Sequence, residues 1–573
     1  MKTLADIPEN ADFDVIIVGA GINGAGLFRE LAFQDLKVLL LDRNDICSGA
    51  SCAPSRLIHG GIKYLETGEF RLVAQSTLER NLLLRNAPHM VRPLPTVLPI
   101  HSWFGGIVPS MRRFLRLGGK MTDRGALVLE AGLQIYDFLG RRSRVMPRHR
   151  MFMREQSRRQ WPHMAPDVIA TAQYYDAAIT QPERLGYECV RDGLEGGRDC
   201  VALTYTVPEG LKDGRLFLRD TLTGESRAVQ GRVIVNAGGA WIDRINHVLG
   251  RETRYIGGTK GSHLLLRHDG LLAELKGRMV YFGTPDGRIC LAYPFFRHVL
   301  VGSTDLRIDD PDQAVCTDEE QDYMLRMLEG LFPGFRFSAA DVIYRYSGVR
   351  PLPATEASDP GIISRDHLIH EDRIEDRIED RIVLSLVGGK WTTFRGLGEE
   401  VADRILGLLH HPRRLSTRHV PIGGGRDFPS GQHFQAYLDE FCLTYGLPRS
   451  RGITLLERYG STARAVAAFC QEEADAPLRS LAGFTRREIA FVVRNELVRS
   501  LSDVLFRRVP IALAGELTPA AVLEVGNIAG EVLGWSVQET GHQCQMAWAE
   551  GRNRHHLTGE LPDISSVSTA LRA

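Results

Sequence analysis

Residues 12–26 read DFDVIIVGAGINGAG, a short apolar run followed at once by three spaced glycines. The run at residues 15–18 is rich in β-branched side chains, as a buried parallel strand requires. In the spacing that follows, Gly19 permits a tight turn, Gly21 lets the backbone approach a pyrophosphate, and Gly24 lets the next helix pack against the strand. The N-terminus of that helix would offer its amides to the phosphates.

A second apolar strand is expected at residues 37–41, directly before Asp42. A carboxylate at the end of the second strand can accept hydrogen bonds from ribose hydroxyls. Strand, glycine turn, helix and acid together predict a dinucleotide-binding α/β unit, with a glycine-rich structural turn as the alternative. The pattern by itself does not separate NAD from FAD.

The composition is that of a globular protein without a dominant charge. The 573 residues include 70 Lys+Arg and 70 Asp+Glu, so no overall field favours a nucleic acid or an acidic partner, and we expect no nucleic acid to bind. Hydrophobic residues make up 43% of the chain, which suffices for a large core. The length favours several domains.

The cysteines and the N-terminus indicate a cytosolic setting. The nine cysteines are scattered without a CxxC pair, which favours reduced thiols over a disulfide framework or a zinc site, and we expect no metal centre. The first residues, MKTLADIPENADFD, lack the apolar stretch of a secretion signal. Residues 93–111 carry no Asp, Glu, Lys or Arg, but four prolines and two adjacent glycines argue against a membrane-spanning helix.

Further stretches of the chain resemble one family of enzymes. GASCAPSRLIHGGIKYLETGEFRLV, residues 49–73, resembles the signature that follows the second strand in FAD-dependent glycerol-3-phosphate dehydrogenases, which are membrane-associated flavoenzymes. Later blocks resemble the same family in the same order: KGSHLLL (260–266), VGSTDL (301–306), RYSGVRPL (345–352), VGGKWTTFRGLGEE (387–400) and NELVRSLSDVLFRR (495–508).

Because these blocks extend over nearly the whole chain, the resemblance implies a fold. It is an α/β fold in which an FAD-binding Rossmann-like domain of the glutathione-reductase/DAO type is interleaved with an antiparallel-sheet substrate domain, followed by an all-helical C-terminal domain. The expected oxidoreductase covers 12–410, with flavin parts at about 12–90, 183–260 and 340–410, substrate parts at about 91–182 and 261–339, and the helical domain at 428–573.

The resemblance also implies an activity. The family oxidises sn-glycerol 3-phosphate to dihydroxyacetone phosphate by hydride transfer to FAD and passes the electrons to a membrane quinone. Alternatives stay open: a dehydrogenase of another polyol phosphate such as erythritol phosphate, an oxygen-reducing glycerophosphate oxidase, or a non-catalytic flavin-binding membrane scaffold. A nicotinamide dehydrogenase is disfavoured because the later blocks match flavoproteins.

The cofactor site is expected around the glycine motif and the later glycine pairs. Gly60 and Gly61 lack a Cβ, so this segment can pass close to the flavin, and Gly388, Gly389 and Lys390 lead into a helix expected from about residue 393. The expected cofactor contacts are Gly19, Gly21, Asn23, Gly24, Asp42, Ser51, Ser55, Leu57, His59, Gly60, Gly61, Gly238, Gly388, Gly389, Lys390 and Thr392.

Oxidation of an alcohol requires a base for the hydroxyl proton. From the resemblance His263 is the first candidate and His59 the second, each with a purely structural role as the alternative. Arg350 is the third catalytic candidate, because it could stabilise a developing negative charge. The expected substrate contacts are Lys63, Tyr64, His263, Thr304, Arg350 and Lys390, where Lys390 could instead face the flavin's pyrimidine edge.

The sequence departs from the family at two places. Lys63 stands where the family pattern GGxRYLE has arginine, and a lysine is a point charge without the planar fork that binds phosphate at two points. NAGGAW at residues 236–241 replaces the family's NATGPW, which keeps a glycine backbone near the cofactor. Lys63 therefore leaves open which polyol phosphate the protein accepts.

A basic segment suggests contact with a membrane. Residues 107–120, IVPSMRRFLRLGGK, would form an amphipathic helix with arginine and lysine on one side. Such a helix can lie in the interface of an anionic inner leaflet, with a solvated surface helix as the alternative. We therefore expect a peripheral protein on the cytoplasmic face of the inner membrane, or a cytoplasmic one; a homodimer is left open.

Three segments carry no expected function. EDRIEDRIEDRI at residues 371–382 would stack like charges as a helix, so a β-hairpin or surface turn is expected. Residues 410–427 are expected to form a linker, since they contain prolines and a glycine triplet. The arginine-rich end after residue 551 is expected to be a poorly ordered terminus.

Overall fold

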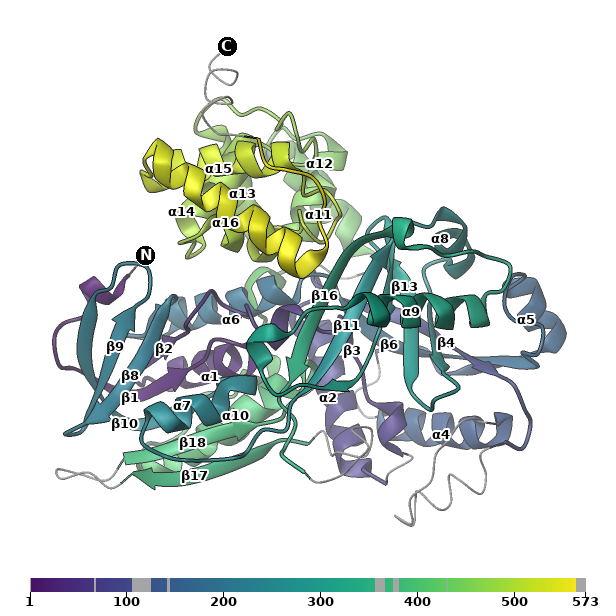
Figure 1. The fold of residues 1–573 in the computed structure, drawn as a ribbon, viewed down its shortest axis with the longest axis horizontal. Helices are drawn as coiled ribbons and strands as arrows, with labels where there is room; N and C mark the ends of the chain where they lie inside the picture. Colours follow the sequence, from purple (N-terminus) through teal and green to yellow (C-terminus); the bar gives the residue numbers. More distant parts are fainter. Residues whose placement is uncertain are drawn as a thin grey trace.

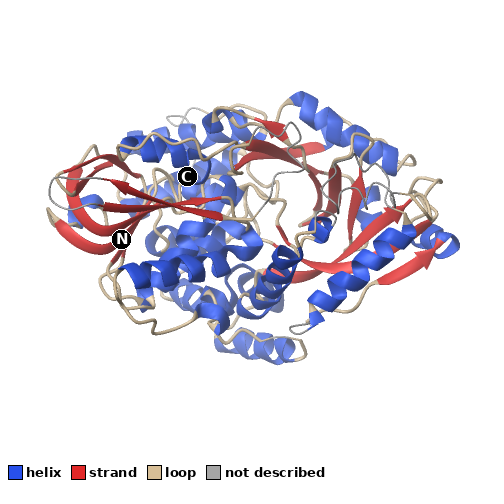
Figure 2. Ribbon diagram, turned by 90° about the horizontal axis from the view of Figure 1, so that it is seen from below, coloured by secondary structure: helices blue, strands red, loops and turns tan. Residues whose placement is uncertain are grey.

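The chain folds into two sheet-containing lobes and a helical domain that packs against both (Figure 1). The computed structural model describes residues 2–65, 68–105, 125–141, 145–355, 366–374, 381–429 and 431–562. Figure 2 looks along another direction and shows the strands of the two sheets on opposite sides of the molecule, with helices between them.

The first sheet is the predicted dinucleotide-binding layer. Its path runs β17-β18-β10-β1-β2-β7, and the antiparallel pair β8 and β9 extends it beside β10. The strands are β1 (Ala11–Val18), β2 (Val38–Leu41), β7 (Val201–Leu203), β8 (Thr206–Lys212), β9 (Arg215–Asp220), β10 (Ser226–Asn236), β17 (Leu368–Ile374) and β18 (Arg381–Val387). Residues 15–18 and all of β2 are buried, as expected for parallel strands covered on both faces.

Helices cover this sheet and bring distant segments together. The covering helices are α1 (Ile22–Ala32), α6 (Pro182–Gly196), α7 (Ile242–Val248) and α10 (Phe394–Leu408). Helix α1 packs against both α6 and α10, so its first turn meets residues near 390 that are far away in sequence. The helix expected from about residue 393 begins at Phe394, after a short 3-10 turn, Trp391–Thr393, and is confirmed.

The second sheet is the expected substrate layer. Its path runs β15-β11-β14-β13-β12-β4-β6-β3, with β16 beside β11 and β5 beside β6. All its pairs are antiparallel except β12 with β4. The strands are β3 (Leu57–Ile58), β4 (Val91–Ile100), β5 (Arg150–Met153), β6 (Ala170–Ile179), β11 (Thr259–Leu266), β12 (Met279–Gly283), β13 (Ile289–Phe295), β14 (His298–Gly302), β15 (Leu306–Arg307) and β16 (Val342–Arg350).

Two expected domain boundaries are wrong. Strand β16 pairs with β11 over most of its length, so residues 342–350 belong to the substrate sheet and not to a flavin part that starts at 340. Strand β3 pairs with β6 and therefore also leaves the flavin part 12–90.

The remaining helices of this lobe are α2 (Phe70–Asn86), α4 (Ala126–Leu139), α5 (Arg154–Gln160), α8 (Asp269–Leu275) and α9 (Asp318–Leu331).

The C-terminal part is helical, as expected. Its α-helices are α11 (His433–Thr444), α12 (Arg449–Tyr459), α13 (Ala463–Gln471), α14 (Arg486–Asn495), α15 (Pro519–Leu533) and α16 (Val537–His555), and a π-helical turn spans Asp503–Arg508. Helix α16 continues to residue 555, so the expectation of a disordered tail directly after residue 551 is wrong. The His555 ring stacks on Tyr344 of β16, with centroids 4.5 Å apart.

A buried charge cluster fastens the helical domain to the dinucleotide-binding layer. Asp45, just after β2, accepts hydrogen bonds from Arg508 at 2.7 Å and from Arg507 at 2.6 Å. All three side chains are buried. Although burial acts to raise it, the two guanidinium groups hold the pKa of Asp45 below its usual range. The cluster therefore joins two domains through groups that would be costly to separate.

The segments without an expected function have defined places. Strands β17 and β18 pair antiparallel up to Ile374 and Arg381, which confirms the hairpin; residues 375–380 lie outside the described part. Residues 410–427 do not form an open linker, because their glycine triplet is buried and a Cβ at Gly424 would lie 2.1 Å from the Tyr459 carbonyl oxygen. The nine cysteines are all free thiols.

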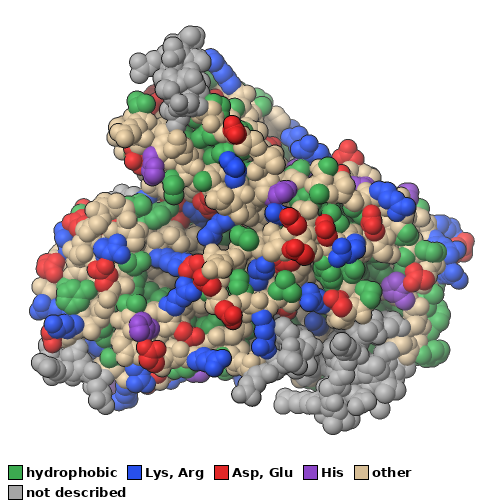
Figure 3. All heavy atoms as spheres, viewed as in Figure 1, with side chains coloured by type: hydrophobic (Ala, Val, Ile, Leu, Met, Phe, Trp, Pro, Cys, Tyr) green, Lys and Arg blue, Asp and Glu red, His purple; other side chains and the backbone are tan. Residues whose placement is uncertain are grey.

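Within the described residues, no helix is both long and apolar enough to cross a membrane. The uncharged stretch examined for this property begins as strand β4. The basic segment 107–120 lies outside the described residues. On the face in Figure 3, Lys/Arg and Asp/Glu side chains are interspersed, in keeping with the neutral composition.

Candidate active site

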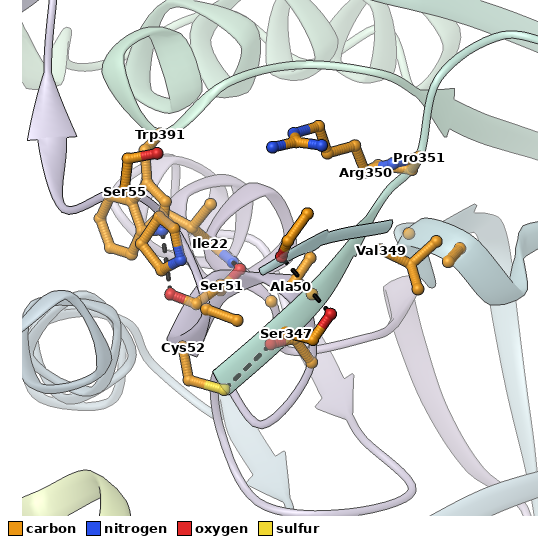
Figure 4. Close-up of a pocket in the computed structure, with 18 of the residues that line it drawn as sticks. Ile22, Ala50, Ser51, Cys52, Ser55, Ser347, Val349, Arg350, Pro351 and Trp391 are labelled. Carbon is orange, nitrogen blue, oxygen red and sulfur yellow. Dashed lines mark hydrogen bonds between the residues drawn. The ribbon is translucent and has the colours of Figure 1, made fainter. Parts of the chain in front are cut away.

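A cavity of about 1030 Å³ runs between the two sheets and reaches the helical domain. This volume is at the upper end of the roughly 300–1,000 Å³ typical of ligand sites. The wall combines the glycine turn after β1, the loop after β3, the ends of β11 and β16, and residues near 390. In the close-up, Ser51, Ser55 and Trp391 lie on one side and Arg350 extends toward them from the end of β16 (Figure 4).

The glycine turn has the geometry of a dinucleotide cradle. Gly19 has φ +108°, a conformation that side chains disfavour. A Cβ at Gly24 would lie 1.9 Å from the Gly19 carbonyl oxygen, so helix α1 can approach the turn only with glycine there. A Cβ at Gly21 would lie 3.3 Å from the Ser51 hydroxyl. Ser51 Oγ itself accepts the Ile22 amide at 2.9 Å, which ties this side chain to the start of the helix.

Asp42 lines the same end of the cavity. Its carboxylate accepts the Ala20 amide at 2.7 Å and the Asn44 amide at 2.9 Å. Burial raises the pKa of Asp42 to about 6, while these two amides act to lower it. The carboxylate is thus fixed beside the cradle, where ribose hydroxyls would donate to it.

A second glycine pair closes the cradle from the side of β18. Gly388 and Gly389 have φ of +80° and +86°, and a Cβ at Gly389 would lie 2.9 Å from Asn23 Nδ2. Asn23 Nδ2 donates to the Gly388 carbonyl at 3.3 Å. Its Oδ1 is buried and has no donor among the described residues. The first-turn amides of α1, which no helix carbonyl can reach, fit a pyrophosphate. The unused Asn23 acceptor fits a hydroxyl or N–H donor elsewhere on a dinucleotide.

Two further expected cofactor residues take part in the wall mainly through their packing. Leu57 lies buried in β3 and lines the cavity. Gly238 also lines it, and a Cβ there would lie 2.2 Å from Ile245, so glycine lets helix α7 pack closely. Gly238 N–H donates to Asn236 Oδ1 at 3.1 Å.

His263 stands in the middle of the cavity wall on β11. Its Nε2 shares a hydrogen bond of 2.8 Å with Ser55 Oγ, and its ring stacks on Tyr346 with centroids 5.0 Å apart. Burial, with smaller contributions from Arg350 and Arg56, lowers the pKa of His263 to about 3. The imidazole is therefore neutral at physiological pH, the form that can accept a proton.

Arg350 is held across β11 by a residue that sequence reasoning overlooked. A Cβ at Gly261 would lie 2.1 Å from Arg350 Nη2, so only glycine leaves room for the guanidinium. Arg350 donates to Asp305 at 3.0 Å, to Ser303 at 3.2 Å and to the Thr304 carbonyl at 3.3 Å. These contacts fix the Arg350 guanidinium in the cavity wall. It packs against Gly261, which stands two residues before His263 on β11.

Thr304, expected as a hydroxyl partner for substrate, lines the cavity, but its hydroxyl is engaged by protein groups. Its hydroxyl donates to Glu320 at 2.6 Å and accepts the Ser262 amide at 2.9 Å. Glu320 also pairs with buried Lys260 at 2.8 Å. Thr304 therefore belongs to a buried network that supports the wall behind Arg350.

The loop after β3 brings three candidates to the cavity, and they are His59, Lys63 and Tyr64. The His59 amide donates to Thr392 Oγ1 at 3.1 Å, which joins the loop to the turn before α10. Lys390 Nζ lies 3.8 Å from the centre of the Tyr64 ring, a cation–π distance. Two lysines from separate segments, Lys63 and Lys390, thus line one cavity, and Tyr64 packs against Lys390.

The two glycines of this loop differ. Gly61 lines the cavity and has φ +77°. Gly60 was expected to pass close to the flavin, but it does not line the cavity, and a Cβ there would lie 2.2 Å from Tyr136 Oη and 2.6 Å from Thr77 Cγ2. The missing side chain of Gly60 makes room for protein atoms behind the loop.

A second feature absent from the sequence predictions closes the Asp42 end. Asp312, in the 3-10 turn Pro311–Gln313, accepts from Arg43 at 2.5 Å, Arg244 at 2.7 Å and the Trp241 ring nitrogen at 3.0 Å. Arg43 also lies over the Trp241 ring, 4.3 Å from its centroid. We call Arg43, Trp241, Arg244 and Asp312 the Asp312 clasp; all four line the cavity. No motif signals it, because its members come from three distant segments.

The arrangement can bind a dinucleotide and carry out proton transfer in one space. The cradle and Asp42 suit a dinucleotide, and the neutral His263 suits an alcohol proton. Arg350, Lys63 and Lys390 supply positive charge for an anionic substrate. Among the described residues, no cluster of His, Cys, Asp and Glu has the arrangement of a metal site.

Comparison with known proteins agrees with this geometry. The family model of FAD dependent oxidoreductases matches residues 14–404, and the model of the C-terminal domain of alpha-glycerophosphate oxidase matches residues 415–540. The chain is 29% identical over 569 residues to a glycerol-3-phosphate dehydrogenase of Synechocystis sp., covering 95% of this chain and 97% of the relative. It is 28% identical over 515 residues to an aerobic glycerol-3-phosphate dehydrogenase of Staphylococcus haemolyticus, covering 87% of each.

A solved structure shows the same fold. The glycerol-3-phosphate dehydrogenase from Bacillus halodurans complexed with FAD superimposes with a TM-score of 0.70 at 22% identity, covering 95% of each chain. The resemblance drawn from the sequence blocks is thereby confirmed, as is the interleaved α/β fold with its helical C-terminal domain. The chain belongs to the FAD dependent oxidoreductase family, with FAD as its cofactor.

Proposed function

We propose that the protein oxidises sn-glycerol 3-phosphate to dihydroxyacetone phosphate and passes the electrons to a membrane quinone. The observation that carries the proposal is the single cavity that joins the dinucleotide cradle to His263 and to three cations. The names of the relatives, glycerol-3-phosphate dehydrogenases over most of both chains, support the same substrate.

The residues of the wall divide the work. When bound, FAD supplies the acceptor for the hydride that leaves the alcohol carbon. The neutral His263 takes the hydroxyl proton at Nε2. In the structure Ser55 Oγ lies 2.8 Å from this nitrogen, and the substrate hydroxyl takes the place of Ser55 Oγ there. Arg350 stabilises the negative charge that develops on the substrate oxygen. Lys63 and Lys390 bind the phosphate, and the buried setting keeps these charges poorly screened.

Anaerobic reduction of the purified flavoprotein tests the substrate. We expect glycerol 3-phosphate to bleach the flavin absorbance near 450 nm, with glycerol as the control that lacks the phosphate. Bleaching only by a longer polyol phosphate such as erythritol phosphate would move the assignment to that substrate. A flavin that no polyol phosphate reduces would refute the proposal and favour a non-catalytic scaffold.

A described surface supports contact with a membrane. Five large apolar side chains are exposed on helix α4 or on the loop beside it: Trp103, Phe104, Leu127, Ile135 and Phe138. The Leu127 amide donates to the Trp103 carbonyl at 3.3 Å, so the loop and the helix are neighbours, and Arg141 lies 4.0 Å from the centre of the Phe138 ring. Aromatic side chains beside cations suit the interface of an anionic lipid layer. A peripheral location on the cytoplasmic face of the inner membrane follows as part of the proposal.

Two measurements test the electron route and the location. The reduced protein should transfer electrons to a soluble quinone faster than to oxygen; the reverse ranking would favour an oxidase. The wild-type protein should co-sediment with vesicles of anionic phospholipid, and the double variant Leu127→Asp, Phe138→Asp should not. Equal sedimentation of both would remove this surface from the membrane proposal.

A further inference from the structure

The loop of residues 59–64 is fastened from behind through one backbone amide. Gly60 N–H donates to Tyr136 Oη and to Asp176 Oδ1, each 3.0 Å away. Gly60 is followed by the two side chains that the proposed function assigns to substrate, Lys63 and Tyr64. The position of this amide therefore bears on where those side chains stand in the cavity.

The partners of the amide form a closed network from three elements. Tyr136 of α4 donates its hydroxyl proton to Asp176 of β6 at 2.6 Å. Arg80 of α2 donates to the Tyr136 oxygen at 2.6 Å and to Asp176 at 2.8 Å. With Gly60, the Tyr136 oxygen thus donates once and accepts twice, which uses its full capacity. All three side chains are buried.

Burial keeps this network in one protonation state. It raises the pKa of Tyr136 well above its ordinary value, so the hydroxyl keeps the proton that it donates to Asp176. The pKa of Arg80 is raised as well: burial acts to lower it, but nearby Tyr136 and Asp176 favour the charged form. Because the Tyr136 oxygen uses all its hydrogen-bonding capacity, any shift of this network leaves a buried polar atom without its partner, so the network resists displacement.

The loop approaches the network as closely as a backbone can. A Cβ at Gly60 would lie 2.2 Å from Tyr136 Oη, 2.7 Å from its Cζ and 2.6 Å from Thr77 Cγ2. Glycine is thus required for contact with the network rather than for contact with a cofactor. On its other side the loop is joined to residues near 390, since the His59 amide donates to Thr392 at 3.1 Å.

We propose that Tyr136 and Asp176 are positioning residues, which hold loop 59–64 so that Lys63 and Tyr64 face the anionic end of the substrate. The inference rests on the proposed function for the identity of that substrate. Asp176 also lines the cavity, so the network reaches from the surface helix α4 to the substrate space. Neither residue transfers a proton to or from the substrate in this assignment.

Tyr136→Phe is the sharpest perturbation because it removes one oxygen and keeps the ring. The ring packs edge-on against Tyr174, with centroids 5.8 Å apart, and this contact survives. Gly60 N–H keeps Asp176 as its acceptor, so the loop loses one of two anchors. A lost hydrogen bond to a network of this kind corresponds to a roughly five- to tenfold change. We expect KM for glycerol 3-phosphate to rise by that factor, while the rate constant of flavin reduction at saturation and the FAD content stay near wild type.

Tyr187→Phe is the matched control. Tyr187 is also buried, and its hydroxyl donates to a backbone carbonyl, that of Asn495, at 3.3 Å, away from the cavity wall. This variant should keep the wild-type KM. An equal rise of KM in both variants would assign the effect to general destabilisation, and an unchanged KM in Tyr136→Phe would refute the positioning role.

Hydrogen–deuterium exchange provides a readout that does not depend on the substrate. Peptides that cover residues 59–64 should exchange faster in Tyr136→Phe than in the wild type, and at the wild-type rate in Tyr187→Phe. Should no polyol phosphate reduce the flavin, the proposed function fails while this measurement still decides the positioning role. Unchanged exchange would refute it.

A second variant covers the case in which Tyr136→Phe does not fold. Gly60→Ala leaves every network side chain in place and pushes the loop away from Tyr136 and Thr77. It should raise KM and accelerate exchange in the same direction. Wild-type values in Gly60→Ala would overturn the inference.

Discussion

Asp312→Asn should loosen the grip of the protein on FAD. The Asp312 carboxylate accepts hydrogen bonds from Arg43 at 2.5 Å, from Arg244 at 2.7 Å and from the Trp241 ring nitrogen at 3.0 Å. It is therefore the common acceptor of the Asp312 clasp. Arg43 directly follows Asp42, the residue placed for ribose hydroxyls. The clasp therefore bridges the substrate lobe and the dinucleotide lobe at the Asp42 end of the cavity, where the adenosine end of FAD would bind, and we expect it to open before that end is released.

The expected magnitude follows from the exposure of the pairs. The side chains of Arg43, Arg244 and Asp312 are 41%, 51% and 39% exposed, so each ion pair contributes only about 0.2–1 kcal/mol. Removal of one carboxylate weakens two pairs together, and we estimate a loss of about 0.5–2 kcal/mol. If this loss falls on the closed state, FAD should dissociate about two- to thirtyfold faster.

The assay is the rise in flavin fluorescence after dilution, because free FAD fluoresces more strongly than protein-bound flavin. Wild-type release should accelerate between 0.05 and 0.5 M NaCl, since salt screens exposed pairs, and release from Asp312→Asn should depend less on salt. Glu457→Gln is the matched control, because Glu457 forms an equally exposed pair with Arg92 at 3.2 Å away from the cavity wall. Equal release from Asp312→Asn and Glu457→Gln at low salt would refute the role of the clasp.

The pKa of Asp312 determines the pH range in which the Asp312 clasp stays closed. Burial acts to raise the pKa of Asp312, but Arg43, Arg244 and Trp241 together hold it below its usual value. A depressed carboxyl pKa means that the pairs are present above the ordinary value of 3.8 and are lost as the pH falls through the lower folded value. Asp312 therefore stays ionised between pH 5 and pH 8, and its titration should cause no change in the rate of FAD release over that range. An increase in release within that range that Asp312→Asn abolishes would contradict the assignment.

Substitutions at three further positions test other parts of the structure. His263→Asn should slow flavin reduction about 10²- to 10⁴-fold at unchanged FAD content. The pKa of His263 is about 3 in the folded protein and 6.5 ordinarily, so below pH 6.5 the unfolded chain binds a proton that the folded protein does not. The wild type should therefore lose about 2 kcal/mol of stability relative to this variant from pH 8 to pH 5. Lys63→Met should raise KM for glycerol 3-phosphate with little change in the rate at saturation, and Lys63→Arg should preserve binding. Asp45→Asn should lower stability by about 3–5 kcal/mol, seen as an earlier urea midpoint, because it leaves buried Arg508 without its carboxylate and removes one of the carboxylates that pair with Arg507.

Each of these has a contradicting result. A normal reduction rate in His263→Asn would transfer the base role to His59. An unchanged KM in Lys63→Met would remove this lysine from the phosphate site. A wild-type urea midpoint in Asp45→Asn would mean that the two arginines find other partners when the helical domain is loosened.

Sequence reasoning located the parts of the site that depend on local chain geometry. The glycine turn, Asp42 and the glycines near 388 were found because a tight turn or a close helix contact admits few residue types. Gly60 shows the limit of this reasoning. A glycine reports that something lies close to the backbone, but the sequence does not say whether that neighbour is a cofactor or, as here, the Tyr136 hydroxyl.

The features that sequence reasoning missed all depend on contacts between distant segments. Thr304 was expected to contact substrate, but its hydroxyl donates a hydrogen bond to Glu320 from a distant segment. The boundary at 340 failed because the pairing partner of β16 is set by the sheet and not by its own residues. The Asp312 clasp joins residues from three segments through ordinary surface charges, which no local pattern distinguishes from solvated ones.

The same contrast explains how the site divides its tasks. Residues in the glycine turns are placed to contact a cofactor through their backbone, and the tight geometry of these turns makes their identity visible in the sequence. Residues that orient the substrate loop, Tyr136 and Asp176, act one layer behind it through side-chain bonds to the Gly60 amide. Because Tyr136 and Asp176 hold the loop through a backbone amide and Tyr136 lies outside the cavity wall, substrate specificity in this chain can change through the supporting layer while the motif facing the cavity stays the same. Substrate specificity then depends both on the Lys63 side chain and on how firmly Tyr136 and Asp176 hold the loop that carries it.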